Sequence, residues 1–258
     1  MTSTRQLALP TYDHRTGTGP TLVFLHYWGG SARTWDLVVD RLPGRDILAV
    51  DFRGWSRSNA LPGPYTLTRL ADDTVAVLAD ARIDDYVLVG HSMGGKVAQL
   101  VAAKRPTGLR GIVLVGSGPA RPAAEITAEY REFLSHAYDT EESTAAARDT
   151  VLTATALPAP IKAQISRDSR AGAGAARTEW PLHGIAEDIT EHTRMINVPA
   201  LVVAGEHDRV EPVDVLRRNL VPFLSGAQFA VIPNTGHLIP LEAPAELADA
   251  ITAFAPAA

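Results

Sequence analysis

Three segments of the sequence carry residue types that could together perform nucleophilic catalysis. The first is "GHSMGG" (90–95), in which Ser92 stands between Gly90 and Gly94, after an apolar run that ends at Val89 and before a helical pattern. A serine on a turn from strand to helix exposes its hydroxyl, and the flanking glycines let strand and helix approach closely. Ser92 is therefore the candidate nucleophile, and an ordinary glycine-rich turn is the alternative.

A serine hydroxyl is a poor nucleophile without a base, and the chain has eight histidines that could supply one. His237 lies in "NTGHLIPLE" (234–242), between the last apolar run and the last helical pattern. Open parallel sheets place their sites in loops of this kind, beyond the carboxyl ends of the strands. His237 is thus the candidate base. His91 is next to Ser92, but we expect its ring to point away from the serine.

The third segment, "AGEHDRVEP" (204–212), offers three carboxylates that could orient the base. Asp208 comes just after an apolar run, where a short side chain could reach inward. Glu206 is expected to lie near the strand and Glu211 to begin the next helix. The predicted catalytic set, in chain order, is Ser92, Asp208 and His237. Taken alone, Asp208 would be interpreted first as a solvated loop acid, and only its combination with Ser92 and His237 favours the catalytic role.

The composition limits the classes of protein to be considered. The chain has 258 residues, enough for one large domain or for a domain with a sizeable insertion. A net charge of −5 argues against nucleic acid and anionic membrane as partners. The absence of cysteine excludes disulfides and thiolate metal sites. No run approaches the ~18 apolar residues of a membrane span, and the amino terminus does not resemble a signal peptide, so we expect a cytoplasmic protein.

Six short apolar runs predict the strands that would position these residues. They are rich in Val, Leu and Ile without polar alternation, which is typical of strands covered on both faces. Helical patterns lie between most of them, and this alternation predicts a mostly parallel sheet with helices on both faces. The predicted strands are 21–26, 46–51, 86–92, 111–117, 200–206 and 227–233.

The segment 119–198 interrupts this alternation, because it contains helical patterns and polar loops but no strand-like run. A stretch of this length between two strands is a subdomain, not a connecting loop. We therefore divide the chain into a core domain, 1–118 and 199–258, and a helical cap, 119–198. The cap is interpreted as a lid over the site, and extra cover for the core is the alternative.

Five motifs occur in the order seen in one known family. They are "FLHYWGG" (24–30), "DFRGWSRS" (51–58), "GHSMGG" (90–95), "GEHDRVEP" (205–212) and "GHLIPLE" (236–242). From about Thr21 to the carboxyl terminus, the chain resembles the α/β-hydrolase-fold superfamily, in its branch of serine-nucleophile esterases and cofactor-free haloperoxidases. The resemblance implies an eight-stranded, mostly parallel sheet with a helical cap inserted after the sixth strand. It implies no metal and no organic cofactor.

The resemblance also implies an oxyanion hole made of two backbone amides, those of Trp28 and Met93. It explains why two glycines follow the aromatic residues of "FLHYWGG": Gly29 and Gly30 let the chain turn away from the sheet. The family usually has glycine where this chain has Tyr27. Its ring is expected to shape the acyl pocket, and a donor role for its hydroxyl is the less favoured alternative.

Two further sets of residues are assigned by the same resemblance. Trp180, from the cap, and Leu238 are expected to line the substrate pocket together with Tyr27, although Trp180 could equally be core of the cap. Asp51 and Arg53 are expected to brace their loop and to take no part in the chemistry. Trp55 is a second departure from the family, which often has a smaller residue or histidine there.

The function predicted from these residues is hydrolysis of a small-to-medium apolar ester or lactone through an acyl-enzyme. Alternatives with the same triad are peroxide-dependent halogenation or perhydrolysis, and carbon–carbon bond cleavage or elimination. A ligand receptor with little turnover is an alternative from another class. The partner is a small-molecule substrate, and the chain is expected to be a monomer or a homodimer.

Overall fold

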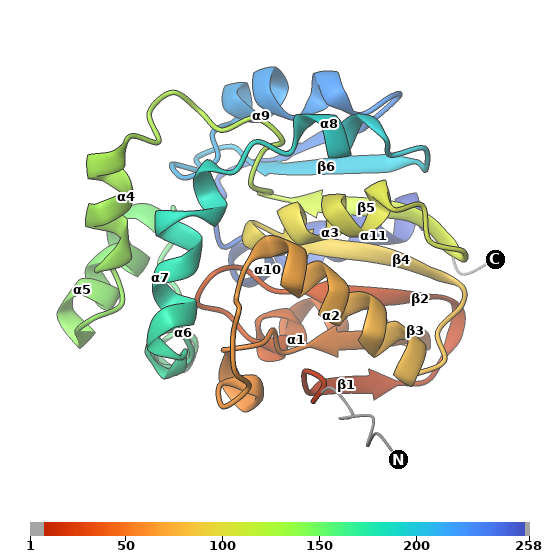
Figure 1. Cartoon of the computed structure of the whole chain (residues 1–258), viewed down its shortest axis with the longest axis horizontal. Helices are drawn as coiled ribbons and strands as arrows, with labels where there is room; N and C mark the ends of the chain where they lie inside the picture. The colour runs from red at the N-terminus through yellow and green to blue at the C-terminus, as the bar shows by residue number, and fades with distance from the viewer. Residues whose placement is uncertain (1–7, 256–258) are drawn as a thin grey trace, which may run out of the picture.

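The computed structural model describes residues 8–255, and its centre is a single seven-stranded sheet (Figure 1). The strand order is β1-β3-β2-β4-β5-β6-β7. Only β1 is antiparallel to its neighbour, and all other pairs are parallel. The strands are β1 (Tyr12–Arg15), β2 (Thr18–Leu25), β3 (Arg45–Val50), β4 (Tyr86–His91), β5 (Leu109–Val115), β6 (Ala200–Gly205) and β7 (Gln228–Ile232).

Each of the six predicted strands is present, as β2 to β7, but the predicted total of eight strands is wrong for the described residues. The seventh strand, β1, is polar and largely exposed at the edge of the sheet, so no apolar run marks it. It pairs with β3 through backbone hydrogen bonds, which do not depend on residue type. The helical insertion accordingly follows the fifth strand of this sheet, β5, and not a sixth.

Helices cover both faces of the sheet, as expected from its apolar strands. In β2, Val23 and Leu25 belong to one core cluster and Leu22 and Phe24 to the other, because successive side chains point to opposite faces. The first cluster includes residues of α2 (Leu67–Asp80), α3 (Met93–Ala103) and α9 (Val213–Asn219), and Ile189 and Ile196 on either side of α8 (Thr190–Arg194). The second packs against α1 (Asp36–Val39), α10 (Ile239–Glu242) and α11 (Pro244–Phe254).

Most of the chain between β5 and β6 is helical and lies beyond the carboxyl ends of the parallel strands, whereas α8 packs against α3 over the sheet (Figure 1). Besides α8 and a short 3₁₀ helix (Gly184–Ala186), this segment contains α4 (Ala128–Ser135), α5 (Glu141–Ala146), α6 (Ala159–Ala171) and α7 (Gly174–Leu182). A π-helical stretch, Ala147–Leu152, directly follows α5. We refer to residues 119–198 as the inserted segment.

The loop after β3 is braced as predicted. Arg53 donates two hydrogen bonds to the carboxylate of Asp73 in α2, at 2.6 and 2.9 Å, and both side chains are buried. Asp51 accepts the backbone N–H of Ala32 at 2.7 Å, which joins this loop to the end of the loop after β2. These contacts hold two loops at the carboxyl edge of the sheet in place.

No helix within residues 8–255 is both long and apolar enough to cross a membrane. The longest, α2, has 14 residues and presents a polar face to the solvent. The cytoplasmic location stays a prediction from the sequence.

Candidate active site

Ser92 lies on the sharp turn between β4 and α3. Its φ of 53° and ψ of −114° are unusual for a residue with a side chain. The glycines on either side are required by close packing: a Cβ at Gly90 would lie 2.4 Å from the carbonyl oxygen of Gly94, and one at Gly94 would lie 2.3 Å from that of Leu25. The string around Ser92 thus encodes a strained turn that presents a hydroxyl above the sheet.

His237 and Asp208 meet in the loops after β7 and β6. Nδ1 of His237 lies 2.8 Å from Oδ2 of Asp208, and these side chains are 2% and 0% exposed. Oδ1 of the same carboxylate accepts the N–H groups of Val210 and Glu211 at 2.8 and 2.9 Å. Because a carboxylate accepts hydrogen bonds, Nδ1 is the donor of the pair and Nε2 is left as the basic nitrogen.

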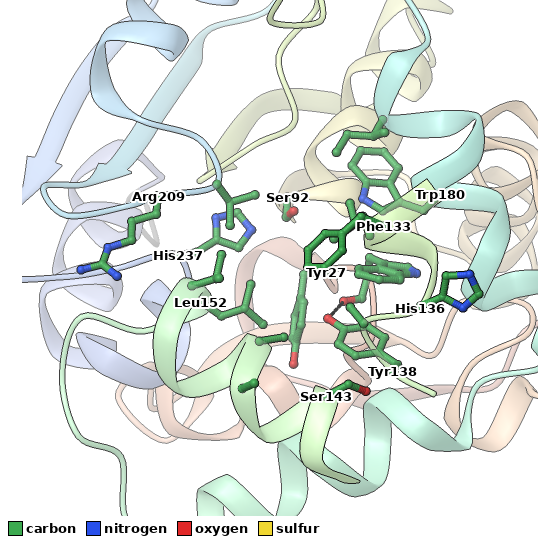
Figure 2. Close-up of a pocket in the computed structure, with 18 of the residues that line it drawn as sticks. Tyr27, Ser92, Phe133, His136, Tyr138, Ser143, Leu152, Trp180, Arg209 and His237 are labelled. Carbon is green, nitrogen blue, oxygen red and sulfur yellow. Dashed lines mark hydrogen bonds between the residues drawn. The ribbon is translucent and has the colours of Figure 1, made fainter. Parts of the chain in front are cut away.

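Ser92 and His237 line one cavity of about 610 Å³, which opens between the sheet edge and the inserted segment (Figure 2). Its wall is mostly apolar and includes Trp28, Trp180 and Ile185. Phe133, on α4, also lines it and is 76% exposed, so an aromatic ring stands at the entrance. The size and the apolar lining are typical of a site for a small molecule.

The two amides predicted to form the oxyanion hole come from different elements. Met93 is the first residue of α3, and its N–H is one of the amides at a helix start that have no partner within the helix. Trp28 follows β2 and lies in a turn closed by a hydrogen bond from Gly30 N to the carbonyl of Tyr27, at 2.9 Å. The side chain of Met93 is buried in the core, so only its backbone could serve the site.

Of the three predicted pocket residues, Tyr27 and Trp180 line the cavity and Leu238 does not. Leu238 is fully buried in a separate apolar cluster with Tyr27, Leu157, Ile165 and Leu241. The backbone amides of His237 and Leu238 both donate to the carbonyl of Leu152, at 3.0 Å. The backbone thus turns sharply here, and the two successive side chains have different surroundings.

Two buried histidines support the site without facing Ser92. His91 donates from Nε2 to the carbonyl of His237 at 2.8 Å, and burial together with the nearby His237 ring holds its pKa well below the usual value. His26 bridges two loops: Nδ1 donates to Tyr27 O at 2.7 Å, and Nε2 accepts the N–H of Phe52 at 3.0 Å. Burial lowers the pKa of His26, which keeps it neutral and able to accept.

A buried lysine joins the helix that follows Ser92 to the inserted segment. The side chain of Lys96 is fully buried, and its Nζ donates to the carbonyls of Gly184 and Ile185 at 3.0 and 3.4 Å. Burial lowers the pKa of Lys96 to about 8, although the charge of Glu211 opposes this shift. Burial, with the neighbouring Asp208 carboxylate, raises the pKa of Glu211 well above its ordinary value.

Sequence reasoning missed the residues of the inserted segment that hold the site loops. Tyr138 donates from its hydroxyl to the carbonyl of Trp28 at 3.1 Å, and Ser169 donates to the carbonyl of Gly29 at 3.0 Å. The sequence predicts a helical lid here, but not which of its side chains reach the loops of the site. Each contact joins residues more than 100 positions apart, and no local motif surrounds either side chain.

Comparison with known proteins agrees with this geometry. The family model described as the alpha/beta hydrolase family matches residues 22–250. The chain belongs to the alpha/beta hydrolase family. It is therefore an enzyme by family, and the fold and the branch predicted from the motifs are confirmed.

The relatives of this hydrolase have different activities. The 2-succinyl-6-hydroxy-2,4-cyclohexadiene-1-carboxylate synthase of Enterobacter sp. (strain 638) is 30% identical over 246 residues, covering 89% of each chain. The non-heme haloperoxidase of Rhodococcus erythropolis is 27% identical over 241 residues, covering 86% of each. The pimeloyl-[acyl-carrier protein] methyl ester esterase of Pseudoalteromonas atlantica is 35% identical, but the match covers only 40% of this chain and 39% of that protein.

Among solved structures, an esterase from Exiguobacterium antarcticum superimposes with a TM-score of 0.86. The match covers 95% of this chain and 94% of that chain at 20% identity. At this identity the likeness establishes the fold alone.

Proposed function

We propose that this hydrolase cleaves a small-to-medium apolar carboxylic ester or lactone, with Ser92 as nucleophile, His237 as base and Asp208 as the group that orients the base. The observation that carries the proposal is the buried hydrogen bond between His237 and Asp208, whose histidine lines the same cavity as the strained Ser92. Nucleophile, base and orienting acid are the three parts of an activated serine.

The mechanism follows from these positions. Ser92 Oγ attacks the carbonyl carbon while Nε2 of His237 takes the hydroxyl proton, and Asp208 stabilises the resulting imidazolium. His237 then gives this proton to the leaving alkoxide, and the alcohol departs from an acyl-Ser92 ester. Water, deprotonated by His237, attacks that ester, and the acid is released as the proton returns to Ser92.

The negative oxygen formed in each addition would be stabilised by the amides of Met93 and Trp28. Such donors contribute ~10²–10³ each to the rate when they are fixed in advance. The Met93 amide also benefits from the positive end of the α3 dipole.

The lining of the cavity sets the substrate class in this proposal. The walls are apolar and are formed by Trp28, Trp180 and Ile185. Tyr27 adds a buried ring, and burial raises the pKa of its hydroxyl, so the side chain stays neutral. An uncharged acyl or alkyl group suits such walls, because burying a charge there would be costly. We assign the inserted segment as the cap that covers this cavity, with residues 1–118 and 199–258 as the catalytic core.

The first test is hydrolysis of p-nitrophenyl esters from acetyl to dodecanoyl, with a Ser92→Ala variant as control. Loss of the nucleophile is expected to lower turnover by ~10⁴–10⁶ while the far-ultraviolet circular dichroism spectrum is retained. Near-normal turnover in the variant would place the reaction elsewhere. A peak at short or medium chains would give the length of the cavity.

Peroxide-dependent chemistry is the second candidate, because a non-heme haloperoxidase is among the relatives. Hydrogen peroxide in place of water would attack the acyl-enzyme and release a peracid. The peracid oxidises added bromide to hypobromous acid, so bromination of monochlorodimedone in acetate, bromide and peroxide, lost in Ser92→Ala, would support this activity. If the protein turned over no ester with either water or peroxide, carbon–carbon cleavage, elimination or a receptor role would be favoured instead.

A further inference from the structure

The turn that carries Trp28 is held by three hydrogen bonds from the inserted segment. Tyr138 Oη donates to Trp28 O at 3.1 Å, Ser169 Oγ donates to Gly29 O at 3.0 Å, and Trp28 Nε1 donates to Arg177 O at 2.9 Å. Tyr138 follows α4, whereas Ser169 lies in α6 and Arg177 in α7. Separate parts of the inserted segment therefore converge on two consecutive residues of one loop.

Packing between the same residues leaves little freedom. The rings of Trp28 and Tyr138 are stacked, with centroids 4.1 Å apart and planes at 28°. A Cβ at Gly29 would lie 2.6 Å from the Tyr138 ring and 2.8 Å from Ser169 Oγ. Only glycine at this position allows the two side chains to reach the loop.

The geometry of the turn explains why these hydrogen bonds matter. Gly30 N donates to Tyr27 O, and Gly29, the third residue of this four-residue turn, has a φ of +91°. A positive φ at that position is the mark of a type II turn, which differs from type I by a flip of its central peptide. The carbonyl of that peptide belongs to Trp28, and it accepts the hydrogen bond from Tyr138.

The preceding peptide plane, which carries the Trp28 N–H, is held from the core by His26 and from within the turn by Gly30. Tyr27 O accepts His26 Nδ1 at 2.7 Å as well as Gly30 N at 2.9 Å. Because the peptide unit is planar, these two contacts orient the N–H of Trp28 opposite to that carbonyl. The next two planes, whose carbonyls belong to Trp28 and Gly29, are held by Tyr138 and Ser169, and the second of these planes carries the Gly30 N–H that donates to Tyr27 O.

We propose that the hydroxyls of Tyr138 and Ser169 are positioning groups for the reaction, because they hold the 27–30 turn in the form in which the Trp28 amide can stabilise the oxyanion. The inserted segment is then a part of the catalytic machinery as well as a cover. This inference rests on the proposed function. Both hydroxyls are buried, and burial raises the pKa of Tyr138 well above its usual value, so it remains a donor at any working pH.

The test compares Tyr138→Phe, Ser169→Ala and the double variant with the unmodified chain, using p-nitrophenyl butanoate. Tyr138→Phe keeps the stacked ring and removes only the hydroxyl. Each single variant is expected to lower kcat about tenfold, less than the ~10²–10³ for complete loss of a donor, and to leave KM within about twofold.

Two inhibitors separate positioning of the oxyanion donor from a change in pocket shape. Ser92 adds to the carbonyl carbon of a trifluoromethyl ketone, 1,1,1-trifluoroheptan-2-one, and the adduct carries an oxyanion. Heptan-2-one occupies the pocket as a neutral ketone. The inhibition constant of the first is expected to rise with the loss in kcat, while that of the second stays constant. Equal weakening of both inhibitors, or an unchanged kcat, would overturn the proposal.

Matched controls remove similar hydrogen bonds elsewhere. Tyr65→Phe loses a hydroxyl that donates to Leu61 O at 3.0 Å, and Ser135→Ala loses one that donates to Glu132 O at 2.8 Å. Both controls are expected to keep kcat within about twofold. If Tyr138→Phe proves unstable in a thermal melt, Ser169→Ala, whose side chain does not line the cavity, decides the question.

The Ser92→Ala variant and the double variant together distinguish a failure of the proposed function from a failure of this inference. Turnover that Ser92→Ala does not abolish would overturn the proposed function and this inference together. Turnover that depends on Ser92 but is unchanged in the double variant would overturn this inference alone.

Discussion

Asp208 is held by its own loop before it contacts His237. Oδ1 accepts two backbone N–H groups, at 2.8 and 2.9 Å, so the carboxylate plane is fixed and Oδ2 is directed to the imidazole. The competing acid, Glu206, is 48% exposed and accepts the backbone N–H of Asn234 at 2.8 Å. The geometry therefore favours Asp208 as the orienting acid.

Replacing Asp208 by Asn is expected to lower kcat by ~10³–10⁴ without unfolding the protein. The amide can still accept the loop N–H groups, but its NH₂ would face Nδ1 of His237 and favour the wrong tautomer. Steady-state hydrolysis of p-nitrophenyl butanoate measures the loss. Glu206→Gln is the matched control, and a large loss in that variant, with Asp208→Asn active, would reassign the acid.

At the residue scale, the sequence predicted the positions that carry local signals. Ser92 and His237 lie in glycine-containing turns directly after or before apolar segments, and Asp208 follows the end of a strand. Tyr138 and Ser169 could not be predicted in the same way, because their role depends on how the inserted segment packs on a loop. Leu238 was misplaced for a related reason: its side-chain direction depends on a backbone turn that the sequence does not reveal.

At the element scale, the ends of the parallel strands determine where the site forms. The register pairs Leu25 with Gly90 and Gly205 with Ile232, so the loops that follow these strands begin at the same edge. Apolar runs predicted these strands because both faces of the sheet are buried. The edge strand β1 escaped prediction because it buries almost nothing.

His26 links two of these loops and is expected to make the protein sensitive to acid. Burial lowers its pKa below that of an unfolded histidine, about 6.5. Between the folded and the unfolded pKa, only the unfolded chain binds the proton, so the free energy of unfolding falls as the pH falls below about 6.5. The proton would also remove the acceptor for the N–H of Phe52.

Urea unfolding between pH 7.5 and pH 5 measures this effect. The stability advantage of the unmodified chain over His26→Gln is expected to shrink by up to about 1.4 kcal/mol per pH unit in this range. His192→Gln, at an exposed position on α8, is the control and should run parallel to the unmodified chain. A difference between His26→Gln and the unmodified chain that does not change with pH would contradict the prediction.

At the scale of the whole molecule, the inserted segment is tied to the loops that carry Trp28 and His237. Leu152 O accepts the amide of His237, and Asp168 of α6 accepts the hydroxyl of Ser31 at 2.7 Å. Trp180 and Ile185 belong to the same core cluster as the sheet. The sequence predicted the helical character of this segment, but the contacts that join it to the loops are long-range, and local patterns do not encode them.

Lys96 is the buried charge at this junction, and its titration gives a test of how the two parts are joined. Its ammonium group donates to backbone carbonyls of the inserted segment and faces the carboxylates of Glu211, Glu187 and Asp188. Burial nevertheless lowers its pKa to about 8, whereas an unfolded lysine titrates near 10.4. Between these values the unfolded chain binds the proton and the folded chain does not.

The stability contributed by Lys96 is therefore expected to rise with pH from about 8 to about 10.4. Since the stability changes by about 1.4 kcal/mol per pH unit in this window, the total gain approaches ~3 kcal/mol. It is measured as the difference in unfolding free energy between the unmodified chain and Lys96→Met at pH 7, 8, 9 and 10. At pH 7 the size of this difference reflects the hydrogen bonds that Lys96→Met removes, and its change with pH reflects the titration of Lys96.

Lys104→Met, which removes a half-exposed lysine paired with Asp72, should show a difference that does not vary with pH. A constant difference for Lys96→Met as well would mean that the carbonyls hold the proton throughout, and that the junction carries a permanent positive charge.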